Sequence, residues 1–261
     1  NMSTQKTMRL AQELYEGVTL KGKGSVGLIT YLRTDSTRIS EEADASCREY
    51  IAQQYGEQFV GDKTAVKSSK TGKIQDAHEA IRPTDSSLSP AMLKEQLPRD
   101  LFRLYQLIWT RFLASRMAEA VYETTSVKIG AGDYRFNVAA SKVKFDGFMT
   151  VYSYDSEKST MNAAMKKITK DTEITLSGLD PQQHFTQPPA HFTEASLVKT
   201  LEELGIGRPS TYAPTITTLL ARRYIVKESK NLYITELGEA VNDMMEDGFP
   251  TIVDVNFTAN M

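Results

Sequence analysis

The chain has 261 residues, of which 40% are hydrophobic and 25% charged, and these fractions are typical of an ordinary soluble protein of one to three domains. Its net charge of −2 means that any nucleic-acid site must be a local basic patch. A single cysteine, Cys47, excludes an intrachain disulfide framework, and one cysteine with three histidines excludes a zinc-type ligand set. No apolar run approaches the roughly 20 residues of a membrane span, and no signal peptide precedes the first helix, so we expect no membrane partner.

The N-terminal part reads as helices around one extended segment. Hydrophobic periodicity predicts a first helix over residues 4–16. A basic, glycine-rich loop at residues 21–24 leads into an apolar run that we expect to be extended over residues 28–33. Ser40 is expected to cap a second helix that ends near Tyr55.

The central part changes from helical to strand periodicity. An amphipathic helix is predicted over residues 99–119. Alternating apolar residues between 127 and 145, with a glycine-rich connection at 130–133, predict a β-hairpin. A further strand is expected over residues 173–176, before a proline-containing boundary near residues 187–189.

Helices return in the last part of the chain. Thr193 is expected to cap a helix, which a tight turn at residues 205–209 separates from a second helix capped by Ser210. Two short apolar runs flanking residues 227–231 follow like a β-wing. Helix, turn, helix and wing form the winged-helix pattern, which often binds nucleic acid.

The predicted fold class is therefore a multidomain α and β protein. We expect a helical domain over residues 1–120 and a β-rich domain over residues 121–188. A winged-helix-like helical domain over residues 189–261 completes the chain.

A first motif, Gly27-Leu28-Ile29-Thr30-Tyr31-Leu32-Arg33-Thr34-Asp35-Ser36, contains the first candidates for chemistry, Tyr31 and Arg33. If their segment is extended, alternate side chains share a face, so both project toward one point. A phenol with a pKa of about 10 is a poor nucleophile at neutral pH, and a nearby cation favours the phenolate. The planar guanidinium of Arg33 also matches phosphate geometry. The pair suits attack on a phosphodiester, although an isolated Tyr-x-Arg is more often a packed tyrosine beside a solvated arginine. Asp35 and Ser36 are expected to cap the next helix rather than react.

A second motif is Ala77-His78-Glu79-Ala80-Ile81-Arg82-Pro83-Thr84. On a helical turn, His78 and Arg82 would stand at i and i+4 on one face, with Pro83 ending the turn. Both side chains suit contact with a phosphate, since histidine adds charge when it is protonated. A single histidine of this kind is more commonly a surface or capping residue.

A third motif joins Phe192-Thr193-Glu194-Ala195-Ser196-Leu197-Val198-Lys199 to Gly205-Ile206-Gly207-Arg208-Pro209-Ser210-Thr211-Tyr212. Its glycines allow a ligand to approach the backbone closely, and a helix beginning at Ser210 offers free N–H groups to an anion. Arg208 is positioned to bind the same anion. The simpler interpretation is a turn between two helices with an incidental arginine. Basic residues elsewhere either neutralise phosphates or form a solvated face: Lys63, Lys67, Lys70, Lys73, Arg222, Arg223, Lys227 and Lys230.

The three motifs, in this order, resemble those of type IA DNA topoisomerases, and the second and third resemble the bacterial topoisomerase I branch. The resemblance implies that Tyr31 attacks a single-strand DNA phosphodiester to give a 5′-phosphotyrosine and a 3′-hydroxyl, with Arg33 beside it. Strand passage and religation would then relax negatively supercoiled DNA. It further implies DNA or phosphate contacts for six residues: His78, Arg82, Lys199, Arg208, Ser210 and Thr211. The β-rich part would correspond to the family's hinge domain.

The resemblance also implies what this chain lacks. The family places a magnesium-binding Toprim domain, with a Glu and an Asp-x-Asp pair, before this region, and no Asp-x-Asp occurs here. We therefore expect Mg²⁺ to be bound by that missing domain of the full enzyme and no metal in this interior fragment, which would be incomplete for relaxation alone. The expected partners are single-stranded and negatively supercoiled DNA and the Toprim domain. The protein is expected to be monomeric, cytoplasmic and nucleoid-associated.

Two other interpretations stay open at this point. A non-catalytic winged-helix DNA-binding protein would explain residues 190–235 but neither the Tyr31 nor the His78 motif. A phosphodiesterase or tyrosine recombinase would use the same nucleophile, and a recombinase would form a bond of the opposite polarity, to a 3′-phosphate.

Overall fold

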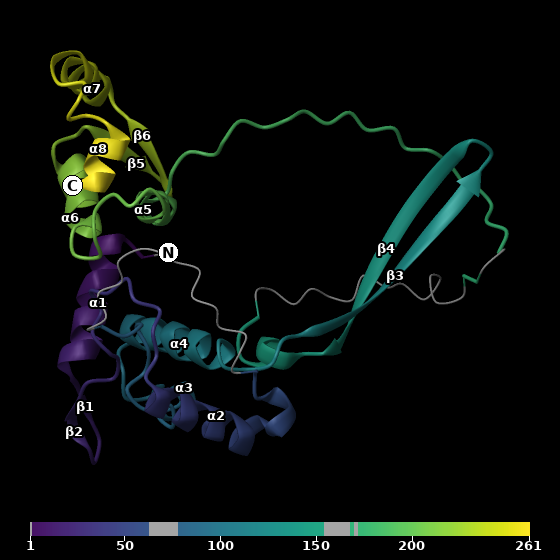
Figure 1. Cartoon of the computed structure of the whole chain (residues 1–261), viewed down its shortest axis with the longest axis horizontal. Helices are drawn as coiled ribbons and strands as arrows, with labels where there is room; N and C mark the ends of the chain where they lie inside the picture. Colours follow the sequence, from purple (N-terminus) through teal and green to yellow (C-terminus); the bar gives the residue numbers. More distant parts are fainter. Residues whose placement is uncertain (1, 63–77, 154–167, 170–171) are drawn as a thin grey trace. The chain divides into compact units, whose positions relative to one another are not determined.

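The computed structural model describes residues 2–62, 78–153, 168–169 and 172–261 (Figure 1). The chain forms two compact units, each assembled from separate stretches of sequence. The first comprises Asn1–Ile39, Lys70–Gln106 and Gln187–Met261, and the second comprises Ser40–Ser69 and Leu107–Thr186. The three-domain division with boundaries near residues 120 and 188 stays a prediction. In the described part of the chain, no helix combines the length and the apolar character that crossing a membrane requires.

The first helix begins and ends where the sequence predicts. Helix α1 (Thr4–Glu16) starts after Ser3, whose hydroxyl accepts a hydrogen bond from the Lys6 N–H. It buries Leu10, Ala11 and Leu14 on one face. The expected basic loop is the turn of a small hairpin, in which β1 (Val18–Leu20) pairs with β2 (Gly24–Val26).

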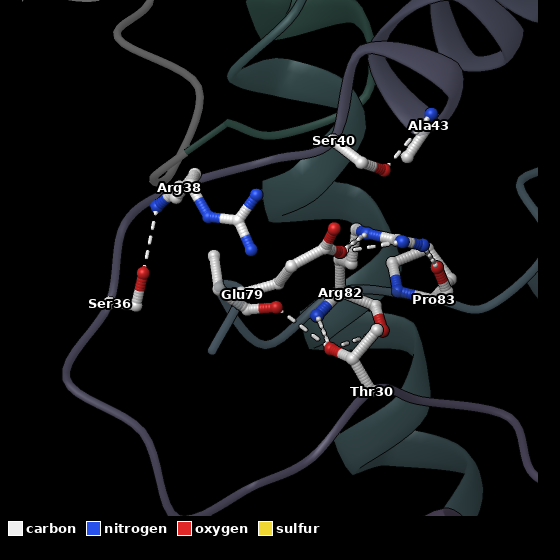
Figure 2. Close-up of polar contacts among 9 residues, drawn as sticks. Thr30, Ser36, Arg38, Ser40, Ala43, Glu79, Arg82 and Pro83 are labelled. Atoms are coloured by element: carbon white, nitrogen blue, oxygen red, sulfur yellow. Dashed lines mark hydrogen bonds and ion pairs between the residues drawn. The ribbon is translucent and has the colours of Figure 1, made fainter. Parts of the chain in front are cut away.

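Helix α2 (Glu41–Tyr55) belongs to the second unit and is capped by Ser40, as predicted. The Ser40 hydroxyl accepts a hydrogen bond from the Ala43 N–H at 3.4 Å (Figure 2). The capping role expected for Asp35 and Ser36 is wrong: the Ser36 hydroxyl accepts from the Arg38 N–H instead, within the loop that precedes the helix (Figure 2).

Helix α4 (Arg99–Ala114) carries the predicted apolar stripe but ends before residue 119. Leu101, Tyr105 and Trp109 are buried along it. The helix ends early because the following backbone has other partners: the Arg116 carbonyl accepts from the Gly61 N–H, and Met117 pairs with Val60. Short helical segments precede it, namely η1 (Glu57–Phe59) and α3 (Pro90–Leu93).

The predicted β-hairpin is present as one long antiparallel ribbon. Strands β3 (Val121–Ala131) and β4 (Tyr134–Phe145) are joined by a two-residue turn, in which Gly132 has a φ of +60° that suits glycine. The strand expected over residues 173–176 is wrong, since residues 172–186 contain no regular secondary structure. The β-rich expectation therefore reduces to this hairpin, followed by the short η3 (Gly147–Thr150).

The C-terminal stretch shows the predicted order of two helices and a hairpin. Thr193 caps α5 (Glu194–Glu203) through a capping box with Ser196. Helix α6 (Tyr212–Ala221) buries Ile216. The small hairpin of β5 (Ile225–Glu228) and β6 (Asn231–Ile234) buries Leu232. The remaining elements of this stretch are α7 (Glu236–Gly248) and α8 (Val255–Asn260).

Candidate active site and DNA-binding surface

The segment that carries Tyr31 is not a strand, so the strand expected over residues 28–33 is wrong. It makes one antiparallel bridge, between Ile29 and Pro83, and otherwise runs as an irregular loop. Both bridge residues are almost completely buried, and this anchors the loop in the core of the first unit.

Thr30 ties the first motif to the second. Its N–H donates to the Arg82 carbonyl at 2.9 Å, and its hydroxyl accepts from the Arg82 N–H and donates to the Ala80 carbonyl. The Thr84 N–H donates to the Leu28 carbonyl at 3.0 Å, which extends the connection by one more residue pair. Two motifs that are distant in the sequence are thereby held side by side.

Tyr31 lies between two other rings. Its ring centroid is 5.6 Å from that of Tyr15 in an edge-to-face arrangement and 5.2 Å from that of His78. The side chain is not enclosed, because 38% of the residue remains exposed. Gly27 permits this arrangement, since a Cβ there would lie 2.7 Å from the Tyr15 carbonyl oxygen. The nucleophile predicted from the sequence is thus oriented by neighbours yet accessible to a large substrate.

The helical turn predicted for the second motif is absent, and its two candidates diverge. Residues 78–82 have no helical structure, because their backbone bonds to Thr30 instead. His78 contacts Tyr31, whereas the Arg82 guanidinium donates to Glu79 Oε2 at 2.7 and 2.9 Å and to the Pro83 carbonyl at 3.0 Å (Figure 2). His78 is placed beside the nucleophile, and Arg82 is paired within its own motif.

A cavity of about 500 Å³ in the first unit brings the first and third motifs together. Arg33 and Ser210 both line it, with Gln5 and Met8 from α1 and with Ala213 and Pro214 from α6. Arg33 is exposed and has no ion pair with any residue that the structure describes. The cavity therefore offers an uncompensated guanidinium and a hydroxyl to an anionic ligand.

The other candidates of the third motif serve the turn between α5 and α6. Arg208 donates from Nη1 to the carbonyls of Gly207 at 2.6 Å and Gly205 at 3.3 Å. Thr211, not Ser210, is the N-cap residue of α6, so the predicted cap is wrong; the Thr211 hydroxyl bonds to the Arg208 backbone and makes no side-chain cap bond. Lys199 is exposed and lies 3.8 Å from Glu203.

The remaining predicted cations divide between three situations. Lys63, Lys67, Lys70 and Lys73 lie outside the described residues. Lys227 is committed to an ion pair with Glu194 at 2.6 Å, whereas Arg222, Arg223 and Lys230 are exposed.

No metal centre can be assigned to the described residues. Within them, no group of three or more His, Cys, Asp and Glu side chains is arranged to hold a metal ion.

Comparison with known proteins is consistent with this geometry. The profile of a family described as DNA topoisomerase matches residues 1–261. Full-length topoisomerase I from Thermotoga maritima is 38% identical to this chain, with a TM-score of 0.77; the match covers 99% of this chain and 41% of that one. The chain belongs to the family of bacterial type IA DNA topoisomerases. It spans less than half the length of the solved relative.

Some residues of the site were not selected from the sequence. Met8 and Tyr15 follow the apolar periodicity of the first helix, which predicts packing and no chemistry, and Gln5 carries no signal that separates it from other helix residues. Thr30 and Glu194 lie inside the quoted motifs, but their roles depend on contacts with distant parts of the chain.

Proposed function

We propose that this chain is the DNA-cleavage region of a type IA topoisomerase, with Tyr31 as the nucleophile. The observation that carries the proposal is the convergence of the motifs: Tyr31 lies against His78 and is tied through Thr30 to Arg82. Family membership supports the reaction class, because type IA topoisomerases are isomerases of DNA.

In the proposed reaction, the Tyr31 phenol loses its proton and its oxygen attacks the phosphorus of a single-strand phosphodiester. A bond forms between the tyrosine oxygen and phosphorus, which stays attached to the 5′-oxygen of the downstream strand. The bond from phosphorus to the 3′-oxygen of the upstream strand breaks. The departing 3′-oxygen takes up a proton and becomes a hydroxyl. Religation reverses both bond changes, so no external energy source is consumed.

Positive charge serves this reaction because the attacked phosphate gains negative charge in the transition state. Arg33, the cation of the first motif, makes no ion pair with any described residue. His78 lies beside Tyr31 and adds positive charge when it is protonated. Arg82 can reach a phosphate only in competition with Glu79. We assign Ser210, Arg208, Thr211 and Lys199 to holding single-stranded DNA beside the tyrosine.

The full cycle of cleavage, strand passage and religation on negatively supercoiled DNA belongs, in this proposal, to a longer protein. A Toprim domain of that protein would supply the Mg²⁺. The β3–β4 hairpin would form part of the hinge, and residues 189–261 would act as the winged-helix-like DNA-binding part.

The test is covalent capture. The chain is incubated with an oligonucleotide labelled at its 3′ end, with and without a separately produced Toprim domain, and the mixture is denatured. Label on the protein is expected in wild type and absent in Tyr31→Phe. Tyr134→Phe is the matched control, because Tyr134 is 75% exposed on the hairpin and should leave the adduct unchanged.

The polarity of the adduct also separates the alternatives. A bond that retains the 3′-end label is the expected 5′-phosphotyrosine, whereas retention of a 5′-end label instead would indicate recombinase-type chemistry. Intact DNA binding without an adduct in either mixture would reject Tyr31 as the nucleophile. The chain would then be a non-catalytic DNA-binding protein. This is the second candidate function, and the order of two helices and a hairpin in residues 194–234 favours it.

A further inference from the structure

Glu194 is a buried carboxylate whose partners come from distant parts of the first unit. Its Oε2 accepts hydrogen bonds from the Thr4 N–H at 2.7 Å and from the Thr4 hydroxyl at 2.8 Å. Its Oε1 accepts from Lys227 Nζ at 2.6 Å. The side chain is only 8% exposed. This carboxylate, on the first residue of α5, therefore connects α5 to the first residue of α1 and to strand β5.

The charge of Glu194 is compatible with this burial. Removal from water alone would raise the pKa of its carboxyl, but the hydrogen bonds from Lys227 and Thr4 outweigh that effect and hold the pKa below its ordinary value. A carboxylate at the start of α5 is also favoured by the helix dipole. The residue is thus ionised at neutral pH and binds its partners as an anion.

One helix that Glu194 holds, α1, also lines the cavity, and the other helix that lines it, α6, packs against both α1 and β5. Gln5 and Met8 reach the cavity from the first two turns of α1, immediately after Thr4. Ala213 and Pro214 reach it from α6, which packs against α1 and β5. If α1 moved away from α6, Arg33 and Ser210 would no longer line one cavity.

We infer that Glu194 is a positioning residue that fastens α1 to α5 and β5 and thereby assembles the cavity in which Arg33 and Ser210 bind DNA. The DNA-binding part of this inference rests on the proposed function, whereas the fastening part does not. Glu194 itself touches neither the cavity nor Tyr31 among the contacts of the described residues.

Three variants remove the hydrogen bonds and the ion pair of Glu194 in different combinations. Glu194→Ala removes all of them, and Lys227→Met removes the ion pair alone. Thr4→Pro removes both donors of Thr4 while keeping α1, because proline is favoured at the first helical position and Ser3 already has the extended backbone that precedes proline. Glu203→Gln is the matched control for the spin-label distances alone, because Glu203 is an exposed carboxylate on the same helix and its partner, Lys199, is assigned to DNA.

Two measurements are made on the 261-residue chain. The first is the affinity for a single-stranded oligonucleotide, which we expect to fall roughly ten-fold in Glu194→Ala, because Arg33 and Ser210 no longer line one cavity. The second is the distance distribution between spin labels at Arg9 on α1 and Thr215 on α6, both exposed; the single native cysteine, Cys47, is buried. We expect the distribution to broaden in Glu194→Ala and Thr4→Pro and to stay narrow in Glu203→Gln.

The effect of Ser210→Ala on DNA affinity distinguishes a positioning role of Glu194 from a purely stabilising one. The substitution should weaken DNA binding in wild type but have little further effect in Glu194→Ala, because the cavity is already disassembled there. An unchanged spin-label distribution in Glu194→Ala would overturn the inference. So would broadening without loss of DNA affinity. If wild type itself fails to bind the oligonucleotide, the DNA site of the proposed function fails, and the spin labels still decide whether Glu194 fastens α1.

Discussion

The guanidinium of Arg82 is paired with the carboxylate of Glu79, three residues earlier in the same motif. A cation that the sequence assigns to a phosphate is therefore neutralised inside the protein. Glu79→Gln should release it and strengthen binding of single-stranded DNA. The slope of log affinity against log salt should become steeper by roughly 0.7 for one new phosphate contact. Binding titrations at several salt concentrations measure this, and the double variant with Arg82→Ala should return to a shallow slope. An unchanged slope in Glu79→Gln would remove Arg82 from the phosphate-binding set.

Tyr15 orients the Tyr31 ring through an edge-to-face contact at 5.6 Å. Tyr15→Phe keeps this contact and should leave adduct formation with a 3′-labelled oligonucleotide nearly unchanged. Tyr15→Ala should slow it by roughly two- to ten-fold, since such aromatic pairs contribute about 0.5–1.5 kcal/mol. Equal rates in all three proteins would show that the ring contact does not position the nucleophile.

Asp44 makes the second unit sensitive to acid. It accepts hydrogen bonds from Arg48 at 2.6 Å and from Arg116 at 3.0 Å. Burial alone would raise the pKa of its carboxyl, but both arginines together lower it. A lowered folded-state pKa contributes stability that is present above the ordinary Asp pKa of about 3.9 and is lost as the pH falls through the folded-state value.

We therefore expect Asp44→Asn to lower the free energy of unfolding at pH 7 by about 1–3 kcal/mol, and the difference from wild type to shrink below about pH 4. Urea unfolding at a series of pH values measures both. Asp100→Asn, which alters an exposed pair with Lys6, is the control and should change little. A difference that persists undiminished at pH 3 would contradict the electrostatic explanation.

Thr193 and Ser210 are the residues that the sequence predicts to cap α5 and α6. Their replacement by alanine should affect stability differently. Thr193 makes a real cap, so Thr193→Ala should cost about 1 kcal/mol of stability. Ser210 does not cap α6, so Ser210→Ala should leave the melting temperature unchanged while weakening DNA binding. Thermal unfolding of both variants checks this, and a clear drop in the melting temperature of Ser210→Ala would restore the capping role.

Two glycines in α7 test close backbone packing. A Cβ on Gly238 would lie 2.0 Å from the Tyr224 carbonyl oxygen, whereas a Cβ on Gly248 would meet nothing within 4 Å. Gly238→Ala should therefore destabilise the chain by about 1–3 kcal/mol despite the better helix propensity of alanine. Gly248→Ala should be neutral or slightly stabilising. Similar unfolding midpoints for the two variants would show that α7 shifts easily away from Tyr224.

Local signals in the sequence predicted the local elements well. Ser40, Thr193 and the apolar stripe of α4 placed their helices because capping and periodicity act within a few residues. The hairpin of β3 and β4 followed from alternation and a glycine at the turn. Identification of the family followed from the three motifs and is confirmed by the comparisons.

Long-range contacts account for what the sequence could not predict. Residues 28–33 read as a strand, but their backbone found a single bridge and the Thr30 hydrogen bonds instead. The pairing of Arg82 with Glu79 competes with the role that the motif suggested. The catalytic and DNA-binding roles of the eight candidate residues stay predictions.

The contact between Thr4 and Glu194 joins residues separated by 190 positions, and this has a consequence for how the chain folds during synthesis. An isolated helix as short as α1, with 13 residues, is marginal in water. The β3–β4 ribbon pairs neighbours in sequence and needs no distant partner, so it can form as soon as it leaves the ribosome. Within these 261 residues, helix α1 is translated before the other elements yet secured late, because its partner carboxylate lies 190 positions further along the chain.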